Sequence, residues 1–305
     1  MSMRFLKSPL WLGVIYALST TFMIAVMNLL AKLLSEASFH PAELVFYRHL
    51  GGLVLITLII FLYAGASTNL FRTARPKAHI FRGVLGTLGV VLIFGAFAYL
   101  PLTTATLLLF TSSLMMPVFG LVFLGEKIGM RRILAVILGF GGVALMTGFS
   151  DGVNMTGILL ALAGAIANAL VHVALRSLGH TEHPLTTSFY FMVTGLVLTA
   201  PVMLFLPGGD ISGLTLFYLG LLILTGSLSH ITKNAMHVNL PVAVSAPFPY
   251  TALIWAAIFD ILFFGFLPGW SIWAGGAIVI GSNLFLVWRE HKSESRAAQQ
   301  NRPLP

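Results

Sequence analysis

The sequence contains no cysteine and few charged residues. Lys, Arg, Asp and Glu make up 9% of its 305 residues, and 58% of the residues are hydrophobic. The absence of cysteine excludes disulfides and thiol chemistry, and soluble domains are nearer one quarter charged. No stretch between the apolar runs is long enough to form a soluble domain. The composition therefore indicates a protein that lies almost wholly within a membrane.

Motifs for enzyme chemistry are also missing. The chain has neither a G-x-x-x-x-G-K-[ST] loop for direct coupling to ATP nor an H-E-x-x-H metal motif. No cluster of carboxylates or cysteines has the spacing of metal ligands. The net charge of +8 does not indicate a nucleic-acid partner, because membrane proteins carry surplus Lys and Arg on cytoplasmic loops. We therefore expect no enzyme, no metal site, no cofactor and no nucleic-acid partner.

Ten apolar runs recur from one end of the chain to the other. Each is about twenty residues long, the length at which a helix crosses a bilayer. The first run has a basic start but is too long for a cleaved signal peptide, so we expect a retained helix. The predicted spans are residues 9–31, 41–63, 79–99, 102–124, 131–148, 155–175, 185–206, 214–238, 242–264 and 270–288.

The basic residues fall on one side of the predicted membrane. The opposite loops carry only Lys32, at an edge, and their segments "SDGVN" and "PGGDISG" contain acids without bases. Cytoplasmic loops are the ones rich in Lys and Arg, so we predict both termini in the cytoplasm of a bacterial cell, with the protein in its cytoplasmic (inner) membrane. Within the spans this assignment leaves Arg48 and Lys233. The residues assigned to the cytoplasmic side are Arg4, Lys7, Arg72, Arg75, Lys77, Arg82, Lys127, Arg131, Arg132, Arg176, Arg289, Lys292, Arg296 and Arg302.

The chain also repeats itself. The segment "HPAELVFYRHLGGLVL" (His40–Leu55) resembles "HPLTTSFYFMVTGLVL" (His183–Leu198) without a gap. Each unit then holds five spans, and an odd number means that the second unit enters the membrane from the opposite side. We predict an all-α fold of ten transmembrane helices, arranged as two inverted five-helix repeats around a central cavity. The expected units are residues 1–150, residues 151–290, and a loose, polar cytoplasmic tail at 291–305.

The two units resemble the EamA-type branch of the drug/metabolite transporter superfamily. "LPLTTATLLLFTSSLMMPVFGLVFLGEKIGMRR" is similar to that family's fourth helix with its Gly-Glu ending. "PVAVSAPFPYTALIWAAIFDILFFGFLPGWSIWAGGAIVIGSNLFLVWRE" is similar to its ninth and tenth helices. The chain departs from the family pattern at Asp260, where glycine is common. The resemblance implies alternating access through a cavity lined mainly by spans one, three, four, six, eight and nine, with spans five and ten to the side.

One predicted span, residues 214–238, carries a polar stripe. His230, Lys233, Asn234 and His237 are spaced i, i+3, i+4, i+7, so they share one face of a helix. A lysine at the centre of a membrane helix costs about 2.5–3.5 kcal/mol, and each large apolar residue returns only about 0.3–0.6 kcal/mol. The stripe should therefore face water, a substrate or a partner acid, and it is the leading candidate for the binding site. The alternative is that Lys233 extends to the cytoplasmic surface.

Other polar and aromatic residues complete the candidate substrate site. Pro117 should interrupt span four, and Pro247 and Pro249 should interrupt span nine; interrupted spans mark the binding sites of many transporters. Each polar residue taken alone also fits a contact between two helices. The further candidates are Asn28, Arg48, Phe94, Asn168, His172, Tyr250 and Trp255.

These features favour a secondary transporter for a small organic metabolite. Basic groups in the interior favour an anionic substrate, such as an amino acid or another compound with a carboxylate. The aromatic residues leave open a planar vitamin or a nucleoside-like metabolite, and a channel or lipid scramblase is the alternative class. Because one chain holds both halves of the predicted cavity, we expect a functional monomer.

Overall fold

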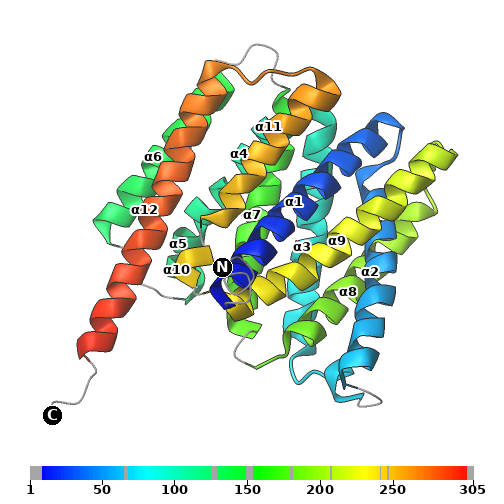
Figure 1. Ribbon diagram of the computed structural model, residues 1–305, viewed down its shortest axis with the longest axis horizontal. Coiled ribbons are helices and arrows are strands. Elements are labelled where there is room, and N and C mark those ends of the chain that lie inside the picture. The colour runs from blue at the N-terminus through cyan, green and yellow to red at the C-terminus, as the bar shows by residue number, and fades with distance from the viewer. Residues whose placement is uncertain are drawn as a thin grey trace, which may run out of the picture.

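The chain is helical wherever the computed structural model describes regular structure (Figure 1). The described residues are 9–64, 68–124, 129–148, 154–178, 181–206, 208–240, 242–245 and 247–300. The helices are α1 (Pro9–Glu36), α2 (Pro41–Ala64), α3 (Pro76–Tyr99), α4 (Leu102–Leu109), α5 (Thr111–Leu124), α6 (Met130–Gly148), α7 (Met155–Leu178), α8 (Pro184–Met203), α9 (Gly213–Asn239), α10 (Val242–Ser245), α11 (Thr251–Phe264) and α12 (Trp270–Gln300), with short 3₁₀ turns η2 (Thr68–Phe71) and η3 (Phe248–Tyr250).

These helices supply the expected membrane crossings. Nine described helices are long and apolar enough to span a bilayer, and residues 248–264 form a shorter apolar helix. In order and position they match the ten spans predicted from hydropathy. The all-helical membrane fold is therefore confirmed.

Local sequence sets where several helices begin and end. Proline is the first residue of α2, α3 and α8, a position where its missing N–H leaves no helical hydrogen bond unmade. Ser212 begins α9 with a capping box, in which its side chain accepts from the Thr215 amide and the Thr215 hydroxyl accepts from the Ser212 amide. Gly265 ends α11 with φ +60°, a conformation that glycine adopts without strain.

Spans four and nine are both interrupted, but only one interruption lies where proline predicted it. Span nine is divided between α10, η3 and α11, and η3 contains Pro249. Span four is divided at Phe110, between α4 and α5, while α5 continues through Pro117. The prediction that Pro117 breaks the span was therefore wrong. Neighbouring helices in a membrane can satisfy the carbonyl that a proline leaves free, so the helix continues.

The C-terminal segment also differs from expectation. Residues after 290 were predicted to be loose, yet α12 continues as a helix to Gln300. The segment "SESRAAQQ" contains Glu, Arg, Ala and Gln, which are strong helix formers. The charged residues of this segment make it unsuitable as a membrane span, but they do not prevent it from forming a helix.

The two halves of the chain pack in matching ways. Figure 1 shows α6 and α12 together at one edge of the molecule, and α2 and α8 pack together toward the other. α1 packs on α9 as α7 packs on α3, and α2 packs on α9 as α8 packs on α3. Each helix pair therefore has a counterpart made of the equivalent helices of the other half. With five spans in each half, corresponding helices run in opposite directions, as an inverted repeat requires.

Apolar side chains lie both inside and outside the bundle. Phe94 and Phe97 of α3 are fully buried in the main core, while large apolar side chains such as Val54 and Leu138 are exposed on the outer surface. Lipid is as apolar as these side chains, so close packing rather than hydrophobicity must hold the helices together. α6 and α12 meet through Gly142 and Gly275, where an added Cβ on either would contact the other's carbonyl.

Candidate functional site

The candidate site centres on a hydrogen bond between α2 and α9. Nη2 of Arg48 lies 3.2 Å from Nε2 of His230. Arg48 extends across Gly226, where an added Cβ would lie 3.1 Å from its Nε, so the glycine leaves space for the arginine. Two residues of the predicted site, which are 182 positions apart in the sequence, are thus in direct contact.

A second arginine joins the cluster from α3. The Arg82 guanidinium carbon lies 4.0 Å from the centre of the Phe191 ring of α8, and that of Arg48 lies 6.0 Å from the same centre. His49 packs edge-on against this ring at 4.8 Å. A cation over an aromatic face is attracted by the ring's quadrupole. Phe191 is therefore the point at which groups from α2 and α3 converge.

Both guanidinium groups are buried and incompletely bonded. Arg48 is 6% exposed and Arg82 is 8% exposed. Among the described residues, the Nε and Nη1 atoms of each arginine are buried and have no hydrogen-bond partner. Arginine keeps its charge inside proteins, and an unmatched buried charge costs several kcal/mol (about 3–5 when one partner of a buried pair is removed). These buried donors suit an acceptor that another molecule supplies.

Lys233 completes the cluster on α9, one turn beyond His230. Its side chain is exposed, and its charge lies close enough to Arg82 for the two to repel. The exposed apolar residues of α9 include Phe217, Leu224 and Ile231, which repeat every seven positions and mark the face toward lipid. Lys233 lies about 160° around the helix from Ile231, at 100° per residue. Its exposure is therefore to space on the inner side of α9.

No described carboxylate pairs with Arg48, Arg82 or Lys233. Glu43, which is close to Arg48 in sequence, instead accepts hydrogen bonds from the Gly209 amide at 3.2 and 3.3 Å. Glu182 contacts His79 and the Thr73 hydroxyl. Within the described part of the chain, the cluster is therefore cationic without an internal counter-charge.

The other predicted residues lie in different surroundings. Tyr250 packs edge-on against Phe110, and Trp255 packs against Phe22. Asn168 donates to the Ser112 hydroxyl at 3.2 Å. Asn28 and His172 are half-buried, and Phe94 is fully buried in the core. Asn234 and His237 lie on α9, but their side chains are outside the described part of the structure.

Arg82 and Phe191 were not among the predicted site residues. Arg82 was assigned to the cytoplasmic side together with Arg72, Arg75 and Lys77, although the predicted span 79–99 includes it; it lies in the span that α3 forms and is buried. Gly86, one turn after Arg82, was a usable signal: an added Cβ there would lie 2.8 Å from the Phe191 ring. Phe191 itself gave no signal among 24 phenylalanines.

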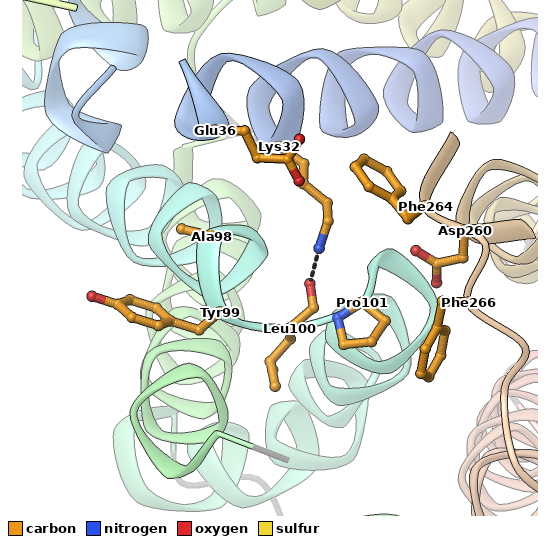
Figure 2. A pocket seen from close by; sticks show the side chains of 9 residues that line it. All are labelled: Lys32, Glu36, Ala98, Tyr99, Leu100, Pro101, Asp260, Phe264 and Phe266. Atoms are coloured by element: carbon orange, nitrogen blue, oxygen red, sulfur yellow. Dashed lines mark hydrogen bonds between the residues drawn. The ribbon is translucent and has the colours of Figure 1, made fainter. Parts of the chain in front are cut away.

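A second polar group lies where α3 ends and α4 begins. Figure 2 shows Lys32 of α1 reaching the Leu100 carbonyl, 2.6 Å from its Nζ, and Lys32 also donates to the Phe97 carbonyl at 3.3 Å. The fully buried Asp260 of α11 accepts from the amides of Leu102 and Thr103 at 2.9 and 2.7 Å. These bonds satisfy the open carbonyls of α3 and the open amides of α4.

A pocket of about 290 Å³ opens beside these bonds (Figure 2). Lys32 was expected at a membrane edge, but its ammonium group is held by the chain itself, so it is not a free cation. Both oxygens of Asp260 are also in use. The pocket is lined by Lys32, Glu36, Ala98, Tyr99, Leu100, Pro101, Asp260, Phe264 and Phe266.

Comparison with known proteins connects this architecture to membrane transport. The model of the EamA-like transporter family matches residues 11–148 and again residues 155–288. The pseudopaline exporter CntI of Pseudomonas aeruginosa is 29% identical over 275 residues, covering 88% of this chain and 93% of its own. The S-adenosylmethionine uptake transporter of Rickettsia felis is 27% identical, covering 84% and 86%. The riboflavin transporter of Rhizobium johnstonii is 25% identical, covering 94% of each chain.

A solved crystal structure shares the fold. It covers 89% of this chain and 98% of its own, with a TM-score of 0.59 and 18% sequence identity. At this identity the match shows the arrangement of helices alone.

Proposed function

The chain belongs to the EamA-like transporter family, whose members are membrane transporters and not enzymes, and on that premise we propose that it carries a small anionic metabolite across the bacterial cytoplasmic membrane. The substrate bears at least one carboxylate or comparable anionic group. It binds to the cluster formed by Arg48, Arg82, His230 and Lys233, and transport proceeds by alternating access. One chain contains both halves, so the functional unit is a monomer.

The unsatisfied arginine donors support this proposal most directly. Arg48 and Arg82 keep four nitrogen atoms without partners in a buried setting, and the described residues supply no acid to match them. Charge-assisted hydrogen bonds between guanidinium and carboxylate are among the strongest in proteins. An anionic substrate would supply hydrogen bonds in place of those that the arginines lose when burial removes them from water.

The polar junction between α3 and α4 fits a closed gate in this scheme. Lys32 and Asp260 tie α1, α3, α4 and α11 together at the face predicted to be outside. Lys233, by contrast, is exposed near the end of α9 predicted to be inside. We infer a conformation that admits substrate from the cytoplasm and is closed to the exterior.

A planar metabolite is the second candidate, favoured by two relatives. Proteins 25% and 27% identical to this chain are named as transporters of riboflavin and of S-adenosylmethionine. Tyr250 and Trp255 are half-buried aromatic residues that could stack on such a compound. In this conformation both rings already pack on neighbours, so the proposal rests on the basic cluster.

A thermal-stability screen of the purified protein tests the proposed substrate class. A ligand present at 100 times its Kd stabilises the folded state by about 2.7 kcal/mol. We expect organic acids to raise the unfolding temperature of the wild type but not of Arg48→Gln. Lys77→Gln, which alters an exposed base of α3, is the matched control and should respond like the wild type. Stabilisation by riboflavin or another uncharged compound, with no response to any organic acid, would contradict the proposal.

A further inference from the structure

The two arginines reach one position from different helices. Arg48 comes from α2 and Arg82 from α3, and both guanidinium groups lie against the Phe191 ring. Within the part of the chain that the structure describes, each has an Nε and an Nη1 without a hydrogen-bond partner. The cluster therefore offers two separate sets of donors, and a single carboxylate bound at one arginine leaves the other set unused.

The charges of the cluster also exceed what one carboxylate can neutralise. Arg48 and Arg82 are both more than nine-tenths buried, so neither charge is fully hydrated. A substrate with one negative charge would leave a buried guanidinium unmatched in its bound state. Lys233 differs, because its exposed side chain keeps its own water.

An amino group on the substrate has no matching partner here. A carboxylate would match the charge of a zwitterionic amino acid's ammonium, and no described carboxylate lies in the cluster. Such a group would instead add a third positive charge beside the two arginines. The surroundings thus disfavour a simple amino acid, one of the substrates that the sequence left open.

Resting on the proposed function, we propose that the substrate is a dianion whose negative charge is shared between Arg48 and Arg82 across the Phe191 ring. The class comprises dicarboxylates and phosphate monoesters. Phe191 is a positioning residue: its ring orients both guanidinium groups, and it acts on the substrate only by placing those groups. Gly86 and Gly52 support this arrangement, since an added Cβ at Gly86 would strike the Phe191 ring and one at Gly52 would lie 2.8 Å from Sδ of the adjacent Met192.

Matched pairs of ligands test the charge of the substrate. Binding to the purified, full-length protein is measured by calorimetry for succinate, glutarate and adipate and for the monomethyl ester of each, with glycerol 3-phosphate and its methyl phosphodiester as the phosphate pair. A charge-assisted hydrogen bond lost on removing one charge corresponds to about a 10- to 100-fold weaker Kd. At least one dianion should bind with a lower Kd than its own monoanionic ester by this factor. Whether the dicarboxylates or the phosphate ester bind more tightly shows which kind of group carries the two negative charges of the substrate.

Variants of the cluster show whether the arginines carry the discrimination. In Arg82→Gln the preference for the dianion should fall toward unity, and Lys77→Gln, also on α3, should retain the full ratio. Phe191→Leu should weaken dianion binding more than monoester binding, and Phe191→Tyr should restore the ratio, which a general packing defect would not do. Arg82→Lys keeps the charge and should retain part of the preference for the dianion over its monoanionic ester. A size-exclusion profile is used to check that each variant is folded.

Two other results would overturn the inference. If every monoester binds as tightly as its dianion, and Arg82→Gln weakens both equally, the substrate is a monoanion and the proposed function stands without the second charge. If none of these anions binds to the wild type, both this inference and the anionic-substrate proposal fail.

Discussion

Arg82 is a residue whose burial opposes stability and whose proposed role is to bind substrate. The residue is 92% shielded from solvent, and two of its donor nitrogens have no partner among the described residues, so its charge is costly to bury without a ligand. Residues kept despite such a cost inside membranes mark substrate pathways. The cation–π contact with Phe191 offsets part of the cost.

Replacement of Arg82 by methionine should therefore stabilise the protein without substrate. Methionine keeps the contact with the Phe191 ring through its thioether and removes the charge. We expect a gain of about 1–4 kcal/mol, visible as a higher unfolding temperature in detergent, together with loss of stabilisation by organic acids. A lower unfolding temperature would instead show that Arg82 is a structural support.

Lys233 should affect transport rather than folding. Lys233→Met removes the charge, and because the side chain is exposed, the unfolding temperature should change little. Uptake into proteoliposomes should fall to background, and Lys233→Arg should recover part of it because it keeps the charge in a different shape. Normal uptake by Lys233→Met would remove this residue from the site.

At the residue scale, sequence reasoning found part of the cluster. His230 and Lys233 were predicted because polar groups at helical spacing are conspicuous in an apolar span, and Arg48 because it lies deep inside one. Arg82 and Phe191 were missed because a base near a helix end resembles a loop residue, and one phenylalanine resembles another. Their role depends on which helices pack together, which spacing within one helix does not reveal.

At the scale of elements, the junction between α3 and α4 depends on charges from both halves of the chain. Asp260 is fully buried and accepts two backbone amides at the start of α4, where the helix dipole favours a negative group. The unusual acid noted in the sequence thus has a local explanation. Pattern reasoning marked span four as interrupted, but it placed the interruption seven residues late, at Pro117 rather than Phe110.

Asp260→Asn should destabilise this junction. Asparagine has one side-chain oxygen in place of two, so only one of the two backbone amides keeps its acceptor, and that hydrogen bond is no longer charge-assisted. We expect a loss of about 1–3 kcal/mol in the free energy of unfolding, measured by thermal or denaturant unfolding in detergent. Asp210→Asn, at an exposed acid, is the control and should be neutral. Equal stability of the two variants would mean that Asp260 does not hold the junction.

At the scale of the whole molecule, the fold could be predicted far more completely than the site. Ten apolar runs and their internal repeat suffice to define the spans, because lipid requires every crossing segment to be a helix of similar length. The duplication, seen in the sequence as His40–Leu55 against His183–Leu198, reappears as exchangeable packing of α1 on α9 and α7 on α3. The tail was predicted less well, since helix propensity outside the membrane leaves no hydropathy signal.

The orientation in the membrane is a prediction at this scale. The surplus of Lys and Arg predicts that both termini lie in the cytoplasm. Reporters fused after Ser150 and after Gly209 should then read outside, while one fused after Arg289 should read inside. A cytoplasmic signal after Ser150 or Gly209 would contradict the inverted-repeat topology, and with it the assignment of the Lys32–Asp260 junction to the outer face.

The most direct test of the central claim is substrate exchange in proteoliposomes that contain only this protein. Uptake of radiolabelled succinate, glutarate, glycerol 3-phosphate, riboflavin and S-adenosylmethionine is measured with and without the same unlabelled compound inside. The basic cluster predicts that at least one organic anion shows saturable uptake, accelerated by internal anion and lost in both Arg82→Gln and Lys233→Met. Saturable uptake of riboflavin or S-adenosylmethionine alone, unchanged by either substitution, would contradict the claim that the cluster binds the transported substrate.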